Sequence, residues 1–70
     1  MIILTEREQN VLYYLARGLK NNEIGYELNI SVHTVKAHLE TIYEKLGVTN
    51  RVQAVIKALQ MECLDVKELV

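Results

Sequence analysis

Residues 21–46 read NNEIGYELNISVHTVKAHLETIYEKL, and their pattern predicts two helices joined by a turn. The apolar residues of its second half recur at helical spacing, at positions i, i+4, i+7 and i+11 from Val35 to Leu46. On a helical wheel they lie within about 60° of one another, so they form one stripe and leave the opposite face polar. In so small a chain, a helix face without packing residues indicates a surface that meets a partner.

The first half of the stretch predicts a shorter helix at residues 22–28. Asn21 is a favourable N-cap, and Ile24 and Leu28 mark the buried side. Gly25 lies in the middle of this helix, where glycine costs about 0.5–1 kcal/mol relative to alanine. We therefore expect another helix to approach closely at Gly25.

A tight turn joins the two predicted helices. Asn29 tolerates the left-handed conformation that a chain reversal needs, and Ser31 is a favourable N-cap for the helix expected at residues 32–46. Two helices joined in this way form a helix-turn-helix unit, here at residues 21–40. In DNA-binding proteins the second helix of such a unit enters the major groove.

A third helix precedes this unit and a fourth follows it. Thr5 and Glu8 have the spacing of a capping box, which predicts a helix at residues 5–17. The fourth helix is expected at residues 51–61. The chain has no Pro and only three Gly among 70 residues, so we predict a single all-α domain.

The predicted fourth helix carries apolar residues on two sides. Val52, Val55, Ile56 and Leu59 form one stripe, which we expect to face the core. A second stripe, offset by roughly 100–160°, offers a surface for a dimer. It consists of Ala54, Ala58 and Met61.

Composition excludes several classes of protein. The single Cys63 cannot form an internal disulfide, and no apolar run approaches the roughly 18 residues of a membrane span, so we expect a cytoplasmic protein. No nucleophile–base set or phosphate-binding loop is present, which indicates that the chain is not an enzyme. His33 and His38 lie about 140° apart on their helix, so we expect no metal site and no cofactor.

Four segments of the chain resemble the LuxR-type helix-turn-helix domain, also called the FixJ/NarL or GerE type. Their spacing agrees with that family over residues 4–59. The segments are Leu4-Thr5-x-Arg7-Glu8-x-x-Val11-Leu12, Gly18-x-x-Asn21-x-Glu23-Ile24, Leu28-x-Ile30-Ser31-x-x-Thr34-Val35-Lys36-x-His38 and Lys45-Leu46-Gly47-Val48.

The resemblance implies a bacterial transcription regulator with a tri-helical core and a C-terminal dimerisation helix. In that family the third helix enters the major groove, and most members carry an N-terminal sensing domain. This chain shows none, so we expect a stand-alone, GerE-like regulator. Gly25 stands where the family usually has Ala, and Glu40 where several members carry Lys, Ser or Asn.

The resemblance and the exposed helix face together select candidate DNA contacts. Lys36 is the leading one, since its ammonium group can reach a guanine edge or a phosphate. His38 borders the apolar stripe and is equally compatible with a packed, hydrogen-bonded imidazole. The full set is Ser31, His33, Thr34, Lys36, Ala37, His38 and Glu40, with Lys20, Asn21, Lys45 and Arg51 as a rim for phosphates.

The net charge of −1 argues mildly against nucleic acid unless the basic residues gather on one face. We expect a sequence-specific homodimer on double-stranded DNA. The alternative is a protein-interaction module that pairs with and modulates a larger LuxR-type regulator. RNA polymerase is a further candidate partner.

Overall fold

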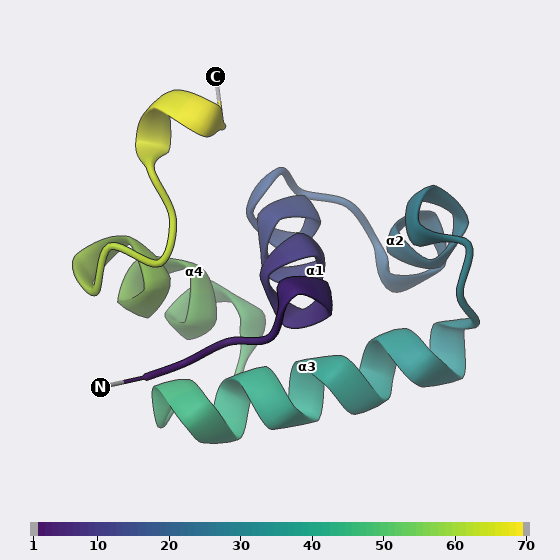
Figure 1. The fold of residues 1–70 in the computed structure, drawn as a ribbon, viewed down its shortest axis with the longest axis horizontal. Coiled ribbons are helices and arrows are strands. Elements are labelled where there is room, and N and C mark those ends of the chain that lie inside the picture. Colours follow the sequence, from purple (N-terminus) through teal and green to yellow (C-terminus); the bar gives the residue numbers. More distant parts are fainter. Residues whose placement is uncertain (1, 70) are drawn as a thin grey trace.

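The computed structural model describes residues 2–69, which form four α-helices and one turn of 3₁₀-helix (Figure 1). Among these residues there is no strand, which confirms the predicted all-α class. Met1 and Val70, which the predicted domain includes, lie outside the described residues. The elements are α1 (Glu6–Ala16), α2 (Asn21–Leu28), α3 (Val32–Leu46), α4 (Arg51–Gln60) and the 3₁₀ turn (Val66–Glu68).

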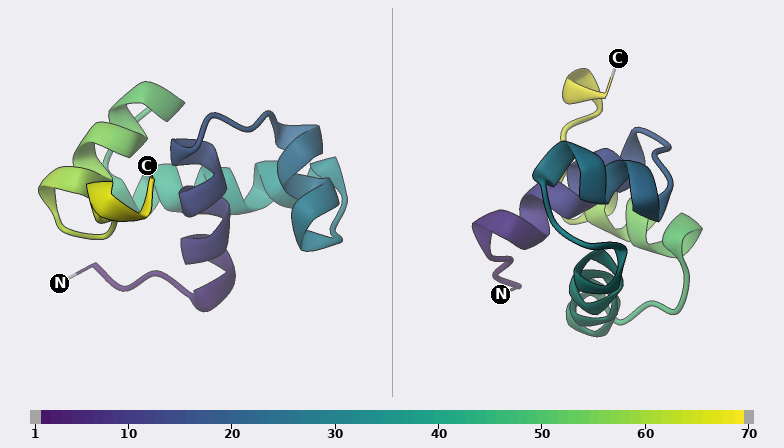
Figure 2. Two further views of the ribbon diagram at one scale, coloured as in Figure 1. Left: turned by 90° about the horizontal axis from the view of Figure 1, so that it is seen from above. Right: turned by 90° about the vertical axis from the view of Figure 1, so that its right-hand side faces the viewer.

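The longest helix, α3, lies along one edge of the molecule, and α1 crosses over it (Figures 1 and 2). α2 packs over the N-terminal half of α3, whereas α4 lies on the other side of α1 (Figure 1). α1 and α3 contact each other, and α2 and α4 each contact both of them. The core is therefore shared by all four helices, and one long side of α3 remains outside it.

The core consists of aliphatic side chains that are at most 7% exposed. They come from all four helices and from the tail, and small alanines fill the positions on α4. The set is Val11, Leu12, Leu15, Ile24, Val35, Leu39, Ile42, Leu46, Ala54, Ala58 and Leu64.

The turn between α2 and α3 has the predicted geometry. Asn29 adopts the left-handed conformation with φ of 56°, and the Ile30 N–H donates to the Gly25 carbonyl at 2.9 Å. A Cβ atom added to Gly25 would lie 2.7 Å from the Ile30 carbonyl oxygen and 3.6 Å from a methyl group of Val35. The close approach expected at Gly25 is therefore present, and the closest atom is the backbone of the turn itself.

α2 begins one residue earlier than predicted. Its N-cap is Lys20 rather than Asn21, because the Glu23 carboxylate accepts a hydrogen bond from the Lys20 backbone N–H at 2.7 Å. α4 begins as expected, with the Asn50 side chain accepting from the N–H of Gln53 at 2.9 Å. Side chains near each helix start thus satisfy backbone donors that the helix leaves unpaired.

The chain leaves α4 through a left-handed residue. α4 ends at Gln60, one residue before the predicted end, and Glu62 has φ of 59°. The N–H of Cys63 then donates to the Ala58 carbonyl at 2.8 Å, which closes the helix end. Among residues 2–69, no helix is both long enough and apolar enough to cross a lipid bilayer.

Candidate nucleic-acid interface

α3 is divided lengthwise between the core and the solvent. Its four stripe residues are at most 5% exposed, as predicted from their spacing. In the right-hand view of Figure 2, α3 is seen nearly end-on at the bottom of the fold. The side chains that face away from the core are exposed, namely His33, Lys36, Ala37, Glu40, Thr41 and Glu44.

Two hydroxyl groups mark the start of this helix. The Ser31 Oγ accepts a hydrogen bond from the N–H of Thr34 at 3.0 Å, so Ser31 is the N-cap. The two side-chain oxygens lie 2.9 Å apart, and either can donate to the other. Both groups lie at the positive end of the helix dipole, where a phosphate is favoured.

A hollow lies beside the exposed face of α3, near the first residues of α2 and α4. Residues from three helices line it, and the two cations among them come from α3 and α4. The lining residues are Asn21, Lys36, Leu39, Glu40, Tyr43 and Arg51. The structure thus gathers four of the predicted DNA contacts, which are up to 30 positions apart in the chain, around one depression.

Arg51 ties the start of α4 to the start of α2. Its Nη2 donates to the side-chain oxygen of Asn21 at 2.8 Å, and its Nη1 donates to the Leu19 carbonyl at 3.3 Å. With the Asn21 oxygen accepting from Arg51, the amide nitrogen of Asn21 is left to donate elsewhere. Sequence spacing offered no signal for this pairing, because the two residues lie in different helices.

The objection raised by the net charge depends on where the cations lie. Lys36 and Arg51 line the hollow, and Lys20 immediately precedes Asn21 at its rim. Arg7 and Arg17 do not line this hollow; the guanidinium of Arg7 donates to the Leu28 carbonyl at 3.4 Å, and that of Arg17 to the Tyr13 hydroxyl at 2.9 Å. Three cations thus lie beside α3 on a chain of net charge −1, and the acidic Glu40 lines the same hollow.

Lys45, also predicted for the phosphate rim, does not line this hollow and is paired within the fold. Its ammonium nitrogen lies 2.6 Å from a carboxylate oxygen of Glu8 and donates to the Ile3 carbonyl at 3.1 Å. Glu8 is only 5% exposed. The hydrogen bond from Lys45, with a second from the backbone N–H of Thr5, holds the pKa of Glu8 below its usual value of 4.5. Lys45 therefore stabilises the fold by neutralising a buried carboxylate.

The two histidines differ in exposure. His33 is exposed near the start of α3, whereas His38 is half-buried at the border of the apolar stripe. Within residues 2–69, no three His, Cys, Asp or Glu side chains gather closely enough to hold a metal ion. Because His33 is the more exposed of the two histidines, it can contact DNA more readily than His38.

Comparison with known proteins identifies this arrangement. The model of the family described as bacterial regulatory proteins, luxR family (GerE) matches residues 2–58. The chain belongs to the luxR family of bacterial regulatory proteins. This assignment confirms the resemblance seen in the sequence.

Relatives of the luxR-family chain include both regulators and solved structures. The nitrate/nitrite response regulator protein NarP of Escherichia coli (strain K12) is 52% identical over 58 residues, which are 83% of this chain and 27% of NarP. The response regulator ChrA of a heme-sensing two-component system superposes with a TM-score of 0.87 at 44% identity, over 89% of this chain and 31% of ChrA. The transcription factor GerE superposes with a TM-score of 0.84 at 35% identity, over 90% of this chain and 94% of GerE.

The chain thus spans about a quarter of the length of NarP and nearly all of the solved GerE chain. These relatives are response regulators and a transcription factor. By its family, this domain is a DNA-binding domain of a bacterial transcription regulator.

In this luxR-family domain, α4 is turned differently from the prediction. Ala54 and Ala58, expected on an outer stripe, are 0% exposed. Val52 and Ile56, expected in the core, are 64% and 52% exposed. The physical reason is size, because small alanines let the axis of α4 approach α1 and α3 closely. Of the predicted outer stripe, only Met61, at 40%, is exposed.

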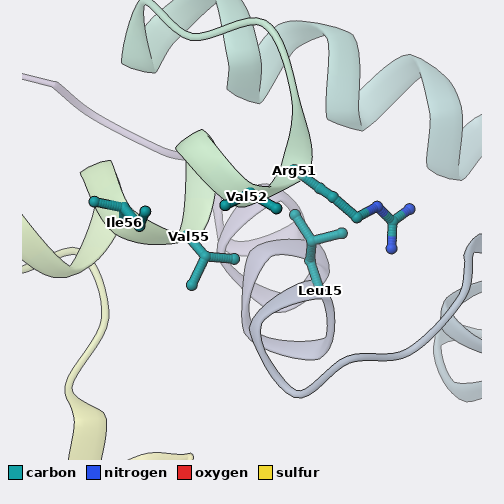
Figure 3. A pocket seen from close by; sticks show the side chains of 5 residues that line it. All are labelled: Leu15, Arg51, Val52, Val55 and Ile56. Carbon is teal, nitrogen blue, oxygen red and sulfur yellow. The ribbon is translucent and has the colours of Figure 1, made fainter.

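The outer side of α4 forms an apolar hollow with α1 (Figure 3). Leu15 of α1 and three aliphatic residues of α4, Val52, Val55 and Ile56, line it together with Arg51. In Figure 3 the guanidinium group of Arg51 extends away from these aliphatic side chains. Arg51 therefore lies between this apolar hollow and the hollow beside α3.

Proposed function

We propose that this luxR-family domain binds specific DNA sequences by placing α3 in the major groove, and that it does so as a homodimer in the bacterial cytoplasm. The observation that carries the proposal is the exposed polar face of α3, with the cations Lys36 and Arg51 at one side of it. The width of the major groove admits one α-helix, and α3 projects from an edge of the fold.

The residues divide into two roles by position. Those on the outer face of α3 are directed at base edges, and these are His33, Lys36, Ala37 and Glu40. Those at the starts of α2, α3 and α4, or at the border of the apolar stripe of α3, are directed at phosphates. Contacts to phosphates position a protein on DNA without reading the base sequence. The residues directed at phosphates are Lys20, Asn21, Ser31, Thr34, His38 and Arg51.

The proposed dimer uses the outer side of α4. Val52 and Ile56 are more than half exposed, although both are large aliphatic residues. Burying them against a second copy would remove apolar surface from water. A dimer that reads two half-sites needs its two α3 helices about 34–36 Å apart, or a multiple of that distance.

Selection from a pool of randomised DNA duplexes tests the function. The purified chain is expected to enrich one sequence with two related half-sites, and its affinity is expected to fall steeply as salt is raised. Binding that is equal for all sequences would contradict specific recognition. Enrichment of a single half-site by a protein that sediments as a monomer would contradict the dimer alone.

The apolar hollow of Leu15, Val52, Val55 and Ile56 also supports the second candidate, a module that pairs with a larger luxR-family regulator. In that case the chain alone would select no DNA sequence, while a full-length regulator of the family would bind it tightly. Ile56→Asp would abolish that binding. RNA polymerase is the third candidate partner. A transcription assay that compares Ile56→Asp with the wild type tests whether the outer side of α4 contacts it.

A further inference from the structure

Glu40 is an acidic residue on the face proposed to meet an acidic polymer. It is exposed, it lies one helical turn after Lys36, and both line the hollow beside α3. No hydrogen bond involving the Glu40 side chain occurs within residues 2–69, where the one ion pair joins Lys45 to Glu8. The carboxylate is therefore not held by the fold and remains available to a ligand.

A carboxylate at this place weakens general attraction to DNA, because it faces the phosphates with the same charge. Only a contact that accepts a hydrogen bond can compensate for this repulsion. In the major groove the donors are the N4 amino group of cytosine and the N6 amino group of adenine. Adenine presents the acceptor N7 beside its amino group, which repels a carboxylate and suits an amide instead. Cytosine is the base that an acceptor-only side chain selects.

We infer that Glu40 reads a cytosine in the half-site, at a fixed distance from the base read by Lys36. This inference rests on the proposed function. Four residues of α-helix span about 6 Å, whereas successive bases along a strand are about 3.4 Å apart. The cytosine therefore lies about two base pairs from the guanine that Lys36 is suited to read.

Three substitutions at Glu40 test the inference through the base they prefer. The half-site profile of each variant is measured by selection from randomised duplexes, beside that of the wild type. Glu40→Gln is expected to move the preference from cytosine to adenine, since an amide pairs with N6 and N7 together. Glu40→Lys is expected to move it to guanine, and Glu40→Ala to remove it, with discrimination falling by about fivefold or more.

Glu44 provides the matched control. It is exposed on the same helix, one turn further from the start of α3, so Glu44→Gln makes the same change of charge without the proposed base contact. This variant is expected to keep the wild-type profile. Because both glutamates are exposed, thermal unfolding of all variants should match the wild type.

The outcomes separate the inference from the function on which it rests. A wild-type profile without a cytosine, or Glu40 variants that keep the wild-type profile, would overturn the reading by Glu40 while leaving DNA recognition intact. A change in base preference shared equally by Glu44→Gln would likewise overturn it. A wild-type chain that selects no sequence at any salt concentration would overturn both.

Discussion

Replacing Ala58 by Asp is expected to unfold the domain. Ala58 is 0% exposed and belongs to the core, so the new carboxylate would be buried without a partner. The effective penalty for burying an unpaired charge is several kcal/mol even after relaxation. At about 0.05–0.15 kcal/mol per residue, a domain of 70 residues has a total stability of only about 4–10 kcal/mol. The penalty is thus comparable with the whole free energy of unfolding.

The matched variant is Ile56→Asp, two residues away on α4. Ile56 is already 52% exposed, so its replacement forfeits roughly half of the burial energy of an isoleucine side chain, about 1 kcal/mol. A loss of that size lowers the melting temperature by about 4–8 °C in a domain of this length. The folded monomer should therefore persist, while self-association through the apolar hollow is lost.

Circular dichroism during heating separates the two variants, and sedimentation measures their association. Ala58→Asp should show little cooperative unfolding at 25 °C, whereas Ile56→Asp should melt cooperatively and sediment as a monomer at concentrations where the wild type is dimeric. The reasoning is refuted if Ala58→Asp melts within a few degrees of the wild type. That result would mean that α4 presents its alanines to solvent, as the sequence pattern first indicated.

Three further experiments each test one local feature of the structure. Glu8→Gln should lower stability at neutral pH by about 1–3 kcal/mol, because a charged hydrogen bond to Lys45 is lost. Folding lowers the pKa of Glu8, so this stability is present above about pH 4.5 and disappears as the pH falls through the folded pKa. Urea denaturation in steps from pH 7 to pH 3 should therefore show the free energies of unfolding of the wild type and Glu8→Gln converging. Glu62→Gly should raise the melting temperature by a few degrees, since φ of 59° favours glycine; an unchanged or lower value would argue against the left-handed end of α4. Arg51→Ala and Asn21→Ala should each weaken DNA binding, and the double variant should lose less than the sum of the two losses; strict additivity would show that their hydrogen bond does not matter for DNA.

The sequence predicted α3 to the residue, and the reason lies in its ends. Ser31 is a strong N-cap, and Gly47 takes the left-handed conformation, with φ of 70°, that ends a helix. α1 has comparable ends, with a capping box at Thr5 and a left-handed Gly18, with φ of 89°. It ends at Ala16, and Arg17 and Gly18 complete the turn. Boundaries were therefore predictable where local chemistry alone determines them.

The orientation of α4 was not predictable from periodicity. Its two stripes are both apolar, so a helical wheel cannot choose between them. The choice depends on the space between α1 and α3, which small side chains such as Ala54 and Ala58 fit and large ones such as Val52 do not. That space is a tertiary property, and no local pattern encodes it.

The candidate site shows the same limit. Lys36, Ala37 and Glu40 follow from the stripe on α3 alone, and the structure leaves all three exposed. Lys45, by contrast, forms an ion pair with Glu8, which lies 37 positions earlier in the chain. The two side chains meet only because α1 crosses α3. A list of basic residues cannot distinguish such a structural lysine from a free one.

The salt dependence of DNA binding by Lys36→Ala shows whether α3 lies in the major groove. Fluorescence anisotropy on the selected duplex, at several salt concentrations, is compared for the wild type, Lys36→Ala and the control Lys67→Ala. Lys67 lies in the exposed 3₁₀ turn, away from α3 (Figure 1). We expect Lys36→Ala to weaken binding by about 5- to 150-fold if the lysine reads a base, or to reduce the salt slope by about 1 if it meets a phosphate. Lys67→Ala should leave both quantities unchanged. Wild-type affinity for Lys36→Ala at every salt concentration would contradict the placement of α3 in the major groove.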